Sequence, residues 1–252
     1  IQEGITLSHE TNLIFGLGVL SGSIQNPDIW SLDLIDLEWT QLNFKLGIRS
    51  PFQTNDYFGN GSVSFGLGGR FYTNEFRKFD GQFNNLESTP FSLYKGIALE
   101  NDEKIFVLGG EQEDASTNSS IYEYDKNLDQ WSLAGSTIIP ITSPTPHFIF
   151  NNNIYVLNQE NNELWKLDLG TFQWQFFINA PSEDLDTGGL AFVIDGHVFM
   201  GLFELDNRIW ELDIATKTWK EKMDYTGSRG DRIAGYIVNQ DKLWLIQSPF
   251  NN

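Results

Sequence analysis

Two acidic stretches carry the residues of this chain that are best suited to binding a metal ion. They are "EQEDASTNSS" (111–120) and "PSEDLDTGG" (181–189), whose carboxylates belong to Glu111, Glu113, Asp114, Glu183, Asp184 and Asp186. Carboxylate oxygens are the ligands that Ca²⁺ prefers. Neither stretch has the spacing of a defined calcium loop, so we interpret both as solvated acidic loops and expect no bound metal or cofactor.

Catalytic chemistry has little support in the residue types. The three histidines, His9, His147 and His197, lie far apart in the sequence, and two of them adjoin apolar runs, as structural histidines do. No Ser–His–Asp arrangement is evident, and the absence of cysteine excludes cysteine nucleophiles, zinc–thiolate sites and disulfides. We therefore assign no catalytic residue and favour a protein that is not an enzyme.

Aromatic residues in two polar stretches are better suited to binding a partner. Phe52 and Tyr57 belong to "SPFQTNDYF", and Phe91 and Tyr94 belong to "TPFSLY". Exposed aromatic side chains commonly anchor protein or sugar partners. The alternative is that these rings hold loops against the rest of the fold.

A repeat supplies the elements that must position these residues. An aspartate recurs at positions 33, 80, 125, 168 and 213, with separations of 47, 45, 43 and 45 residues. An aromatic residue usually lies three positions before it and a tryptophan six positions after it. The residues on this pattern are Trp30, Asp33, Trp39, Asp80, Leu86, Tyr122, Asp125, Trp131, Trp165, Asp168, Trp174, Trp210, Asp213 and Trp219. We expect the tryptophans to be equivalent packing anchors, with Leu86 in the tryptophan position of the second copy.

The pattern predicts four short strands in each unit, which we call A to D. Strand C contains the aspartate, strand D begins at the tryptophan, and short Asn/Asp/Gly turns separate strands A and B. Four strands in about 45 residues are typical of a β-propeller blade. We therefore predict an all-β fold in which residues 1–252 form one β-propeller domain. Its five complete repeats and partial sixth repeat span residues 4–42, 43–89, 90–135, 136–179, 180–223 and 224–252.

Closure of the ring raises a separate question, because the sixth repeat contains only strands A and B. An open propeller would expose unpaired strand edges. We expect six blade positions, with the last blade incomplete or finished by the N-terminal segment from Ile5 to Glu10. A five-bladed ring with an additional hairpin is the alternative.

The two faces of such a ring should differ. The A–B and C–D turns are short and repetitive, and we expect each repeating aspartate to hold its C–D turn by hydrogen bonds to the backbone. The B–C and D–A loops on the opposite face are long and varied, which is where rigid scaffolds carry binding residues. Three charged residues in these loops, Glu113, Asp184 and Arg229, join the four aromatics as the predicted binding set.

The units resemble kelch repeats, which have a double glycine after strand B, then an aromatic residue, then a tryptophan. Gly68–Gly69 and Gly109–Gly110 match the double glycine, whereas "FGLG" (15–18) and "VLNQ" (156–159) depart from it. The "GLG" variant is similar to kelch proteins that many bacteria export. The resemblance therefore implies a kelch-type propeller and an exported protein, in the periplasm or at the cell surface, but it does not specify an activity.

Charge and hydropathy limit the class of partner. The formal net charge of −18 repels phosphate backbones and anionic lipids, so we exclude nucleic acid, and no apolar run is long enough to span a membrane. We favour a non-catalytic interaction or scaffold module that binds another protein, within a multi-subunit cell-envelope or secretion assembly. The alternative is a carbohydrate-binding propeller, or one that resembles the sialic-acid mutarotases.

Overall fold

The structure is a computed structural model in which only β-strands form the regular elements. It describes residues 5–16, 28–42, 57–59, 64–67, 74, 76–93, 95–142, 145–182, 185, 188–203, 206–226, 232–239 and 241–248. Within these ranges the chain has 22 strands and no helix, so the described part contains no helical membrane span.

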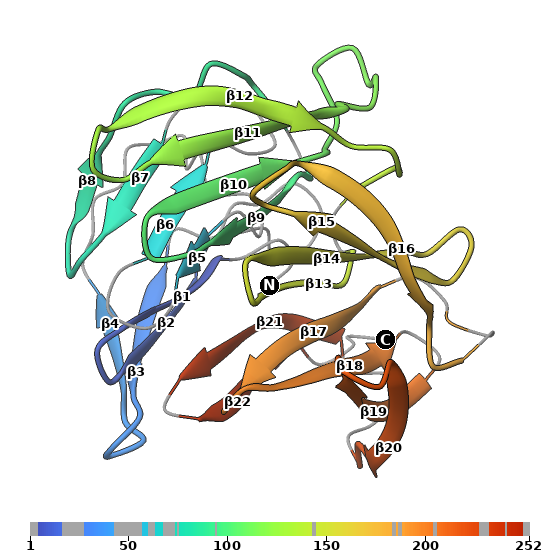
Figure 1. Cartoon of the computed structure of the whole chain (residues 1–252). Helices are drawn as coiled ribbons and strands as arrows, with labels where there is room; N and C mark the ends of the chain where they lie inside the picture. Colours follow the sequence, from blue (N-terminus) through green and yellow to red (C-terminus); the bar gives the residue numbers. More distant parts are fainter. Residues whose placement is uncertain are drawn as a thin grey trace.

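The strands form blades arranged around a common centre (Figure 1). The described residues make five four-stranded antiparallel sheets, which we number blades 1 to 5 in chain order, and one two-stranded sheet, which we call the C-terminal hairpin. The A strands are β1 (Ile5–His9), β5 (Tyr57–Gly59), β9 (Ile97–Glu100), β13 (His147–Phe150), β17 (Gly188–Ile194) and β21 (Arg232–Asn239). The B strands are β2 (Asn12–Gly16), β6 (Ser64–Leu67), β10 (Lys104–Leu108), β14 (Asn153–Asn158), β18 (His197–Phe203) and β22 (Lys242–Ser248).

The outer half of each four-stranded blade is a second hairpin. The C strands are β3 (Ile29–Asp33), β7 (Phe76–Phe79), β11 (Ser120–Asp125), β15 (Glu163–Asp168) and β19 (Asp206–Asp213). The D strands are β4 (Trp39–Leu42), β8 (Phe83–Asn85), β12 (Gln130–Ser136), β16 (Gln173–Asn179) and β20 (Thr218–Asp224). Within each sheet, every strand pairs antiparallel with the next one along the chain. The A–B and C–D turns therefore share one face of the ring, and the B–C and D–A connections share the other.

The A strands line the centre of the ring. Each contacts the A strand of the next blade, and β21 contacts both β17 and β1, which completes a cycle of contacts. Of the two ways in which we expected the last blade to end, incomplete or finished by Ile5 to Glu10, the second is wrong. This segment forms β1, which pairs with β2 as the inner strand of blade 1. The five residues of β1 form a hairpin with β2, the strand that follows them in the sequence.

The short-turn face is built from local turn chemistry. Asn151–Asn152 and Asp195–Gly196 join strands A and B in two-residue turns, and all four residues have positive φ, as type I′ turns require. In the C–D turns of four blades, the Oδ1 atom of the repeating aspartate accepts two backbone N–H bonds. The acceptors are Asp33, Asp125, Asp168 and Asp213, with distances between 2.7 and 3.2 Å.

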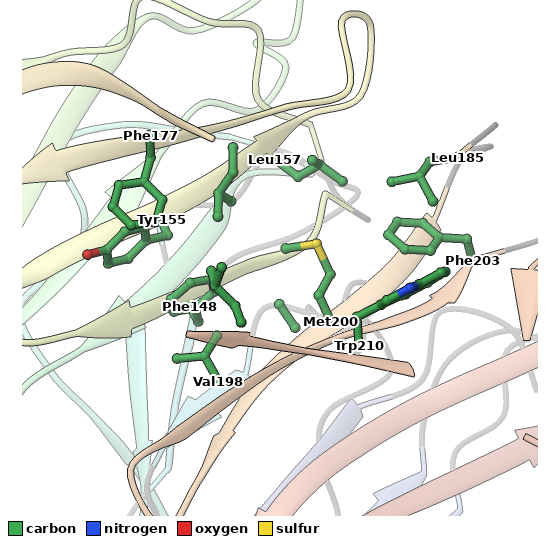
Figure 2. Close-up of a cluster of buried hydrophobic side chains, with 12 residues drawn as sticks. Phe148, Tyr155, Leu157, Phe177, Leu185, Val198, Met200, Phe203 and Trp210 are labelled. Atoms are coloured by element: carbon green, nitrogen blue, oxygen red, sulfur yellow. The ribbon is translucent and has the colours of Figure 1, made fainter. Parts of the chain in front are cut away.

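Hydrophobic contacts between neighbouring blades form the core. The cluster between blades 4 and 5 contains Phe148 and Tyr155 on one side and Met200 and Trp210 on the other, all at most 4% exposed (Figure 2). Phe148 and Tyr155 stack with ring centroids 4.7 Å apart. Burial of large side chains at each junction therefore stabilises one blade against the next.

The strand-D tryptophans add a repeated hydrogen bond to these junctions. The Nε1–H of Trp131 donates to the carbonyl oxygen of Glu87 at 3.2 Å. Trp174 donates to Ser136 O and Trp219 to Asn179 O, both at 2.9 Å. Each acceptor lies at or just beyond the end of strand D in the preceding blade. Each of these three tryptophans thus donates a hydrogen bond to the preceding blade rather than within its own blade.

Blade 2 does not place Leu86 in the tryptophan position. Phe83 pairs with Phe79, as Trp131 pairs with Tyr124 in blade 3, because the C–D turn of blade 2 is three residues shorter. Leu86 instead packs against the buried cluster of Phe76, Ile105 and Tyr124. Spacing counted from Asp80 along the sequence could not detect the shorter turn.

Candidate interaction surface

The best-defined part of the loop-rich face is the connection between strands β10 and β11. It folds back on itself, since Glu111 and Thr117 form an isolated antiparallel bridge and Gln112 N–H donates to Ser116 O at 2.8 Å. Its tip, residues 112–117, is exposed. The loop therefore presents backbone and side-chain groups to solvent in a fixed conformation.

Gly109, Gly110 and Asn118 attach this loop to the ring. Gly109 has a φ of 68°, and a Cβ there would lie 2.3 Å from the carbonyl oxygen of Ile141, so only glycine fits. Gly110 N–H donates to the same carbonyl at 2.8 Å. Asn118 is 5% exposed, and its Nδ2 donates to Gly109 O at 2.9 Å. These contacts hold the base of the loop against the D–A connection that follows blade 3.

The acidic groups of the loop have local partners. The Glu111 carboxylate lies 3.1 Å from Lys95 Nζ, and Asp114 Oδ1 accepts hydrogen bonds from the hydroxyl and the backbone N–H of Ser116. The Ser116 hydroxyl is the main cause that lowers the pKa of Asp114. Glu113 is exposed at the tip. In the part of the chain that is described, no three acidic or histidine residues are grouped so as to hold a metal.

Of the four aromatic residues in the predicted binding set, Phe91 is the only one whose side chain the structure describes. It is half-buried, and its ring centroid lies 4.4 Å from that of Tyr122 and 5.3 Å from that of Trp131. Both partners belong to blade 3, so the ring holds the D–A connection against the blade that it enters. A role of Phe91 in binding stays a prediction.

The other members of the predicted set fall largely outside the described residues. Phe52, Tyr94, Asp184 and Arg229 lie outside them entirely, as do Glu183 and Asp186 of the second acidic stretch. Tyr57 begins β5, but its side chain is outside them as well. The structure therefore brings Phe91 and Glu113 to the same face through the D–A and B–C connections of blade 3, and it leaves the rest of the set as a prediction.

His147 is a titratable group on one of the strands that line the centre of the ring. It begins β13, and its Nδ1 lies 2.7 Å from Thr145 O, so this nitrogen carries the proton of the neutral ring. Burial lowers the pKa of His147, so the ring is neutral at pH 7. With that proton donated to Thr145 O, the Nε2 atom of the neutral ring can only accept a hydrogen bond.

Sequence reasoning missed a cationic residue at the edge of the face. Arg208, near the start of β19, forms a bidentate pair with Asp206, with its Nε and Nη2 at 2.9 and 2.6 Å from the carboxylate oxygens. Its guanidinium lies 4.7 Å from the Trp210 ring centroid. The hydrogen bond from Arg208 lowers the pKa of Asp206. The sequence signal was Asp206-x-Arg208-x-Trp210 at the start of a C strand.

A cleft also opens on the opposite, short-turn face between blades 1 and 2. Its volume is about 360 Å³, and its polar lining includes His9, Asn12, Ser31 and Thr40. The Ser31 hydroxyl donates to Asn12 Oδ1 at 3.1 Å. The cleft is open to solvent and offers hydroxyl and amide groups to a small polar ligand. The sequence analysis did not predict it, because its walls come from two different repeats.

Comparison with known proteins supports the fold and leaves the family open. No protein-family model matches the chain, and no curated protein matches it in sequence. Among solved structures 522 chains match, so the architecture is widely shared and by itself specifies no activity. One of them, titled "Structure of YjhT", is a propeller that superposes with a TM-score of 0.58 at 16% identity, covering 74% of this chain and 70% of that chain.

Proposed function

We propose that the chain is a non-catalytic interaction module that binds another protein through its loop-rich face. The observation that carries this proposal is the braced loop at residues 109–119. Its base is fixed by glycine geometry and by buried hydrogen bonds, and its tip is exposed and acidic. A loop that is ordered before binding loses little conformational entropy when a partner docks. A complementary partner surface would be basic.

Kelch identity and export are part of the proposal. Gly109–Gly110 supports the first, because a Cβ at Gly109 would clash with Ile141 and Gly110 has a φ of 90°, so both positions after strand B of blade 3 favour glycine. The cycle of contacts between the A strands supports six blade positions, with the C-terminal hairpin in the sixth. Export, in a cell-envelope or secretion assembly, rests on the resemblance to exported bacterial kelch proteins.

Charge reversal on the two faces of blade 3 tests the binding face. Glu113→Lys changes the exposed tip of the loop, and Asp102→Lys changes the exposed A–B turn of the same blade. A protein partner would first be captured from the native source and identified, and its affinity for each variant would then be measured by calorimetry. We expect Glu113→Lys to weaken binding at least tenfold and Asp102→Lys to leave it unchanged. The reverse ranking would reject the loop-rich face as the binding surface.

One observation favours the alternative function, binding of a carbohydrate. The cleft between blades 1 and 2 combines hydroxyl, amide and imidazole groups of the kind that bind sugar hydroxyls. Glycan-array screening of the wild type and of a Ser31→Val variant tests it. A glycan that binds the wild type and not the variant would support the alternative, and an array without a hit would remove it.

A further inference from the structure

The cleft between blades 1 and 2 has two structural causes, and the first is the small side chains of blade 1. On the side of each blade that faces the next blade, one residue each of strands B, C and D lie next to one another in the strand register. In blades 3 to 5 the first of them is aromatic and the second is a long charged residue. The three sets are Phe106, Glu123 and Ser132, then Tyr155, Lys166 and Gln175, and then Phe199, Glu211 and Lys220. In blade 1 the residues are Ile14, Ser31 and Thr40, which leave space beside them.

The second cause is the short C–D turn of blade 2. In blades 4 and 5 the fourth residue after the repeating aspartate reaches over the preceding blade. The Phe172 ring centroid lies 6.4 Å from that of Phe106, and Lys217 Nζ lies 4.8 Å from the Phe177 ring centroid. The turn of blade 2 is three residues shorter, so no residue occupies this position, and Gly81 lines the cleft without a side chain. The side of blade 1 that faces blade 2 therefore stays open to solvent.

The uncharged groups of the cleft are suited to a sugar ring. Ser31 is 8% exposed, and its hydroxyl donates to Asn12 Oδ1 at 3.1 Å. This bond fixes the Asn12 amide, whose Nδ2 donors have no partner in the described part of the chain. The hydroxyl of Thr40, which pairs with Ser31 in the register, also has none among those residues. Ile14 and Phe79, both at most 3% exposed, supply apolar lining. A sugar presents hydroxyl groups and an apolar ring face, and the cleft offers a match for each.

The charge of the cleft narrows the class of sugar. Asp33 and Glu38 line it, and no described lysine or arginine does. Asp33 Oδ1 accepts two backbone N–H groups of its turn, and neither carboxylate forms an ion pair with another described residue. In blade 3, by contrast, the Glu123 carboxylate lies 2.9 Å from Lys104 Nζ. Two carboxylates without a cationic partner attract a positive charge, and the walls of a cleft strengthen that attraction.

We propose that this cleft binds an amino sugar. The ammonium group of the sugar pairs with the carboxylates of Asp33 and Glu38, and its hydroxyl groups bond to Asn12 and Thr40. Hydrogen bonds from an ammonium group to a carboxylate are stronger than those from a neutral hydroxyl, so the charge selects the ligand. The volume of about 360 Å³ is near the lower end for ligand pockets and suits one sugar ring. This site rests on carbohydrate binding, the alternative function, and is separate from the loop-rich face.

Three sugars of similar size test the role of the ammonium group. Nuclear magnetic resonance titration of the full chain with D-glucosamine, D-glucose and N-acetyl-D-glucosamine measures the affinities and locates the site. We expect glucosamine to bind at least tenfold more tightly than the other two, because it alone carries a positive charge, and to shift the amide signals of Asn12 and Thr40. The β-1,4-linked disaccharide of glucosamine separates two sources of the ligand. Tighter binding than glucosamine would identify a polymer, and weaker binding the free sugar, and both support the site.

Asp33→Asn is the first variant, because it keeps the oxygen that accepts the turn N–H groups and removes only the charge. It should weaken glucosamine binding at least tenfold, the effect of one charge-assisted hydrogen bond. Asp125→Asn makes the same change in the turn of blade 3, where Asp125 accepts the same two turn bonds, and is the matched control without effect.

Thr40→Lys is the second variant, because it supplies an ammonium group from the chain itself. Thr40 is exposed, and Lys220 stands at the equivalent position of blade 5, so the strand accepts this side chain. We expect the variant to keep the melting temperature of the wild type and to lose glucosamine binding.

Equal affinities for the three sugars would overturn the preference for an amino sugar and leave carbohydrate binding in place. The absence of binding by all of them would overturn the site itself. Unchanged glucosamine binding in Asp33→Asn or in a folded Thr40→Lys variant would do the same. None of these results bears on protein binding at the loop-rich face, which charge reversal at Glu113 tests separately.

Discussion

The junction between blades 4 and 5 and the junction between the C-terminal hairpin and blade 1 use the same repeat motif with different results. At the first, Trp210 is 4% exposed and Trp219 bonds to Asn179 of the preceding blade. At the second, the equivalent Trp30 is 37% exposed and Trp39 is 49% exposed. At these two junctions, the tryptophans of the repeat are buried or hydrogen-bonded only where the preceding blade has an outer strand. The tryptophans are therefore not equivalent, contrary to the expectation from sequence.

The largest difference should come from truncating the strand-C tryptophans. Trp210→Ala should lower the free energy of unfolding by about 3–5 kcal/mol, because it empties a closed cluster between two blades. Trp30→Ala should cost about 1 kcal/mol, since part of that ring already faces solvent. Urea unfolding of both variants measures the two costs. Equal costs would show that coverage by the preceding blade does not decide the role of the tryptophan.

A smaller difference should follow from removing only the indole N–H. Trp219→Phe keeps an aromatic ring but loses the bond to Asn179 O, and it should cost about 1 kcal/mol. Trp39→Phe loses no bond to the described residues and should stay within about 0.5 kcal/mol of the wild type. Thermal unfolding followed by circular dichroism would compare them.

The smallest effect should be seen in acid, at the turns of blades 4 and 5. Hydrogen bonds from Thr171 lower the pKa of Asp168, and hydrogen bonds from Thr216 lower that of Asp213, from the usual value of 3.8. A lowered pKa means that the stabilisation is present above pH 3.8 and is lost as the pH falls through the folded-state value. Asp168→Asn and Asp213→Asn should therefore reduce the pH dependence of the unfolding free energy below about pH 4. An unchanged acid profile in both variants would contradict this.

The loop-rich face shows where sequence reasoning reached its limit. Phe91 and Glu113 are on that face because strand order alone determines the side on which a connection emerges. The contacts of Phe91 with Tyr122 and Trp131 were open to two interpretations in the sequence, because an aromatic residue in a loop can pack or bind. Arg208 and the cleft at His9 were missed, since each depends on residues that come together only when strands pair or blades pack.

The sequence by itself determined the strands and turns of blades 3 to 5 and of the C-terminal hairpin. Period-two apolar runs, Asn/Asp/Gly turns and the aspartate before each C–D turn act over a few residues, and so they could be read along the chain. The tertiary structure alone decided that Phe83 rather than Leu86 pairs with Phe79 in the strand register and that β1 belongs to blade 1. It also decided that the Trp39 side chain is exposed whereas Trp219 donates a hydrogen bond to the preceding blade. These outcomes depend on which strand lies beside which residue about 40 positions away. Local pattern does not contain that information, because it is set by how the blades pack around the ring.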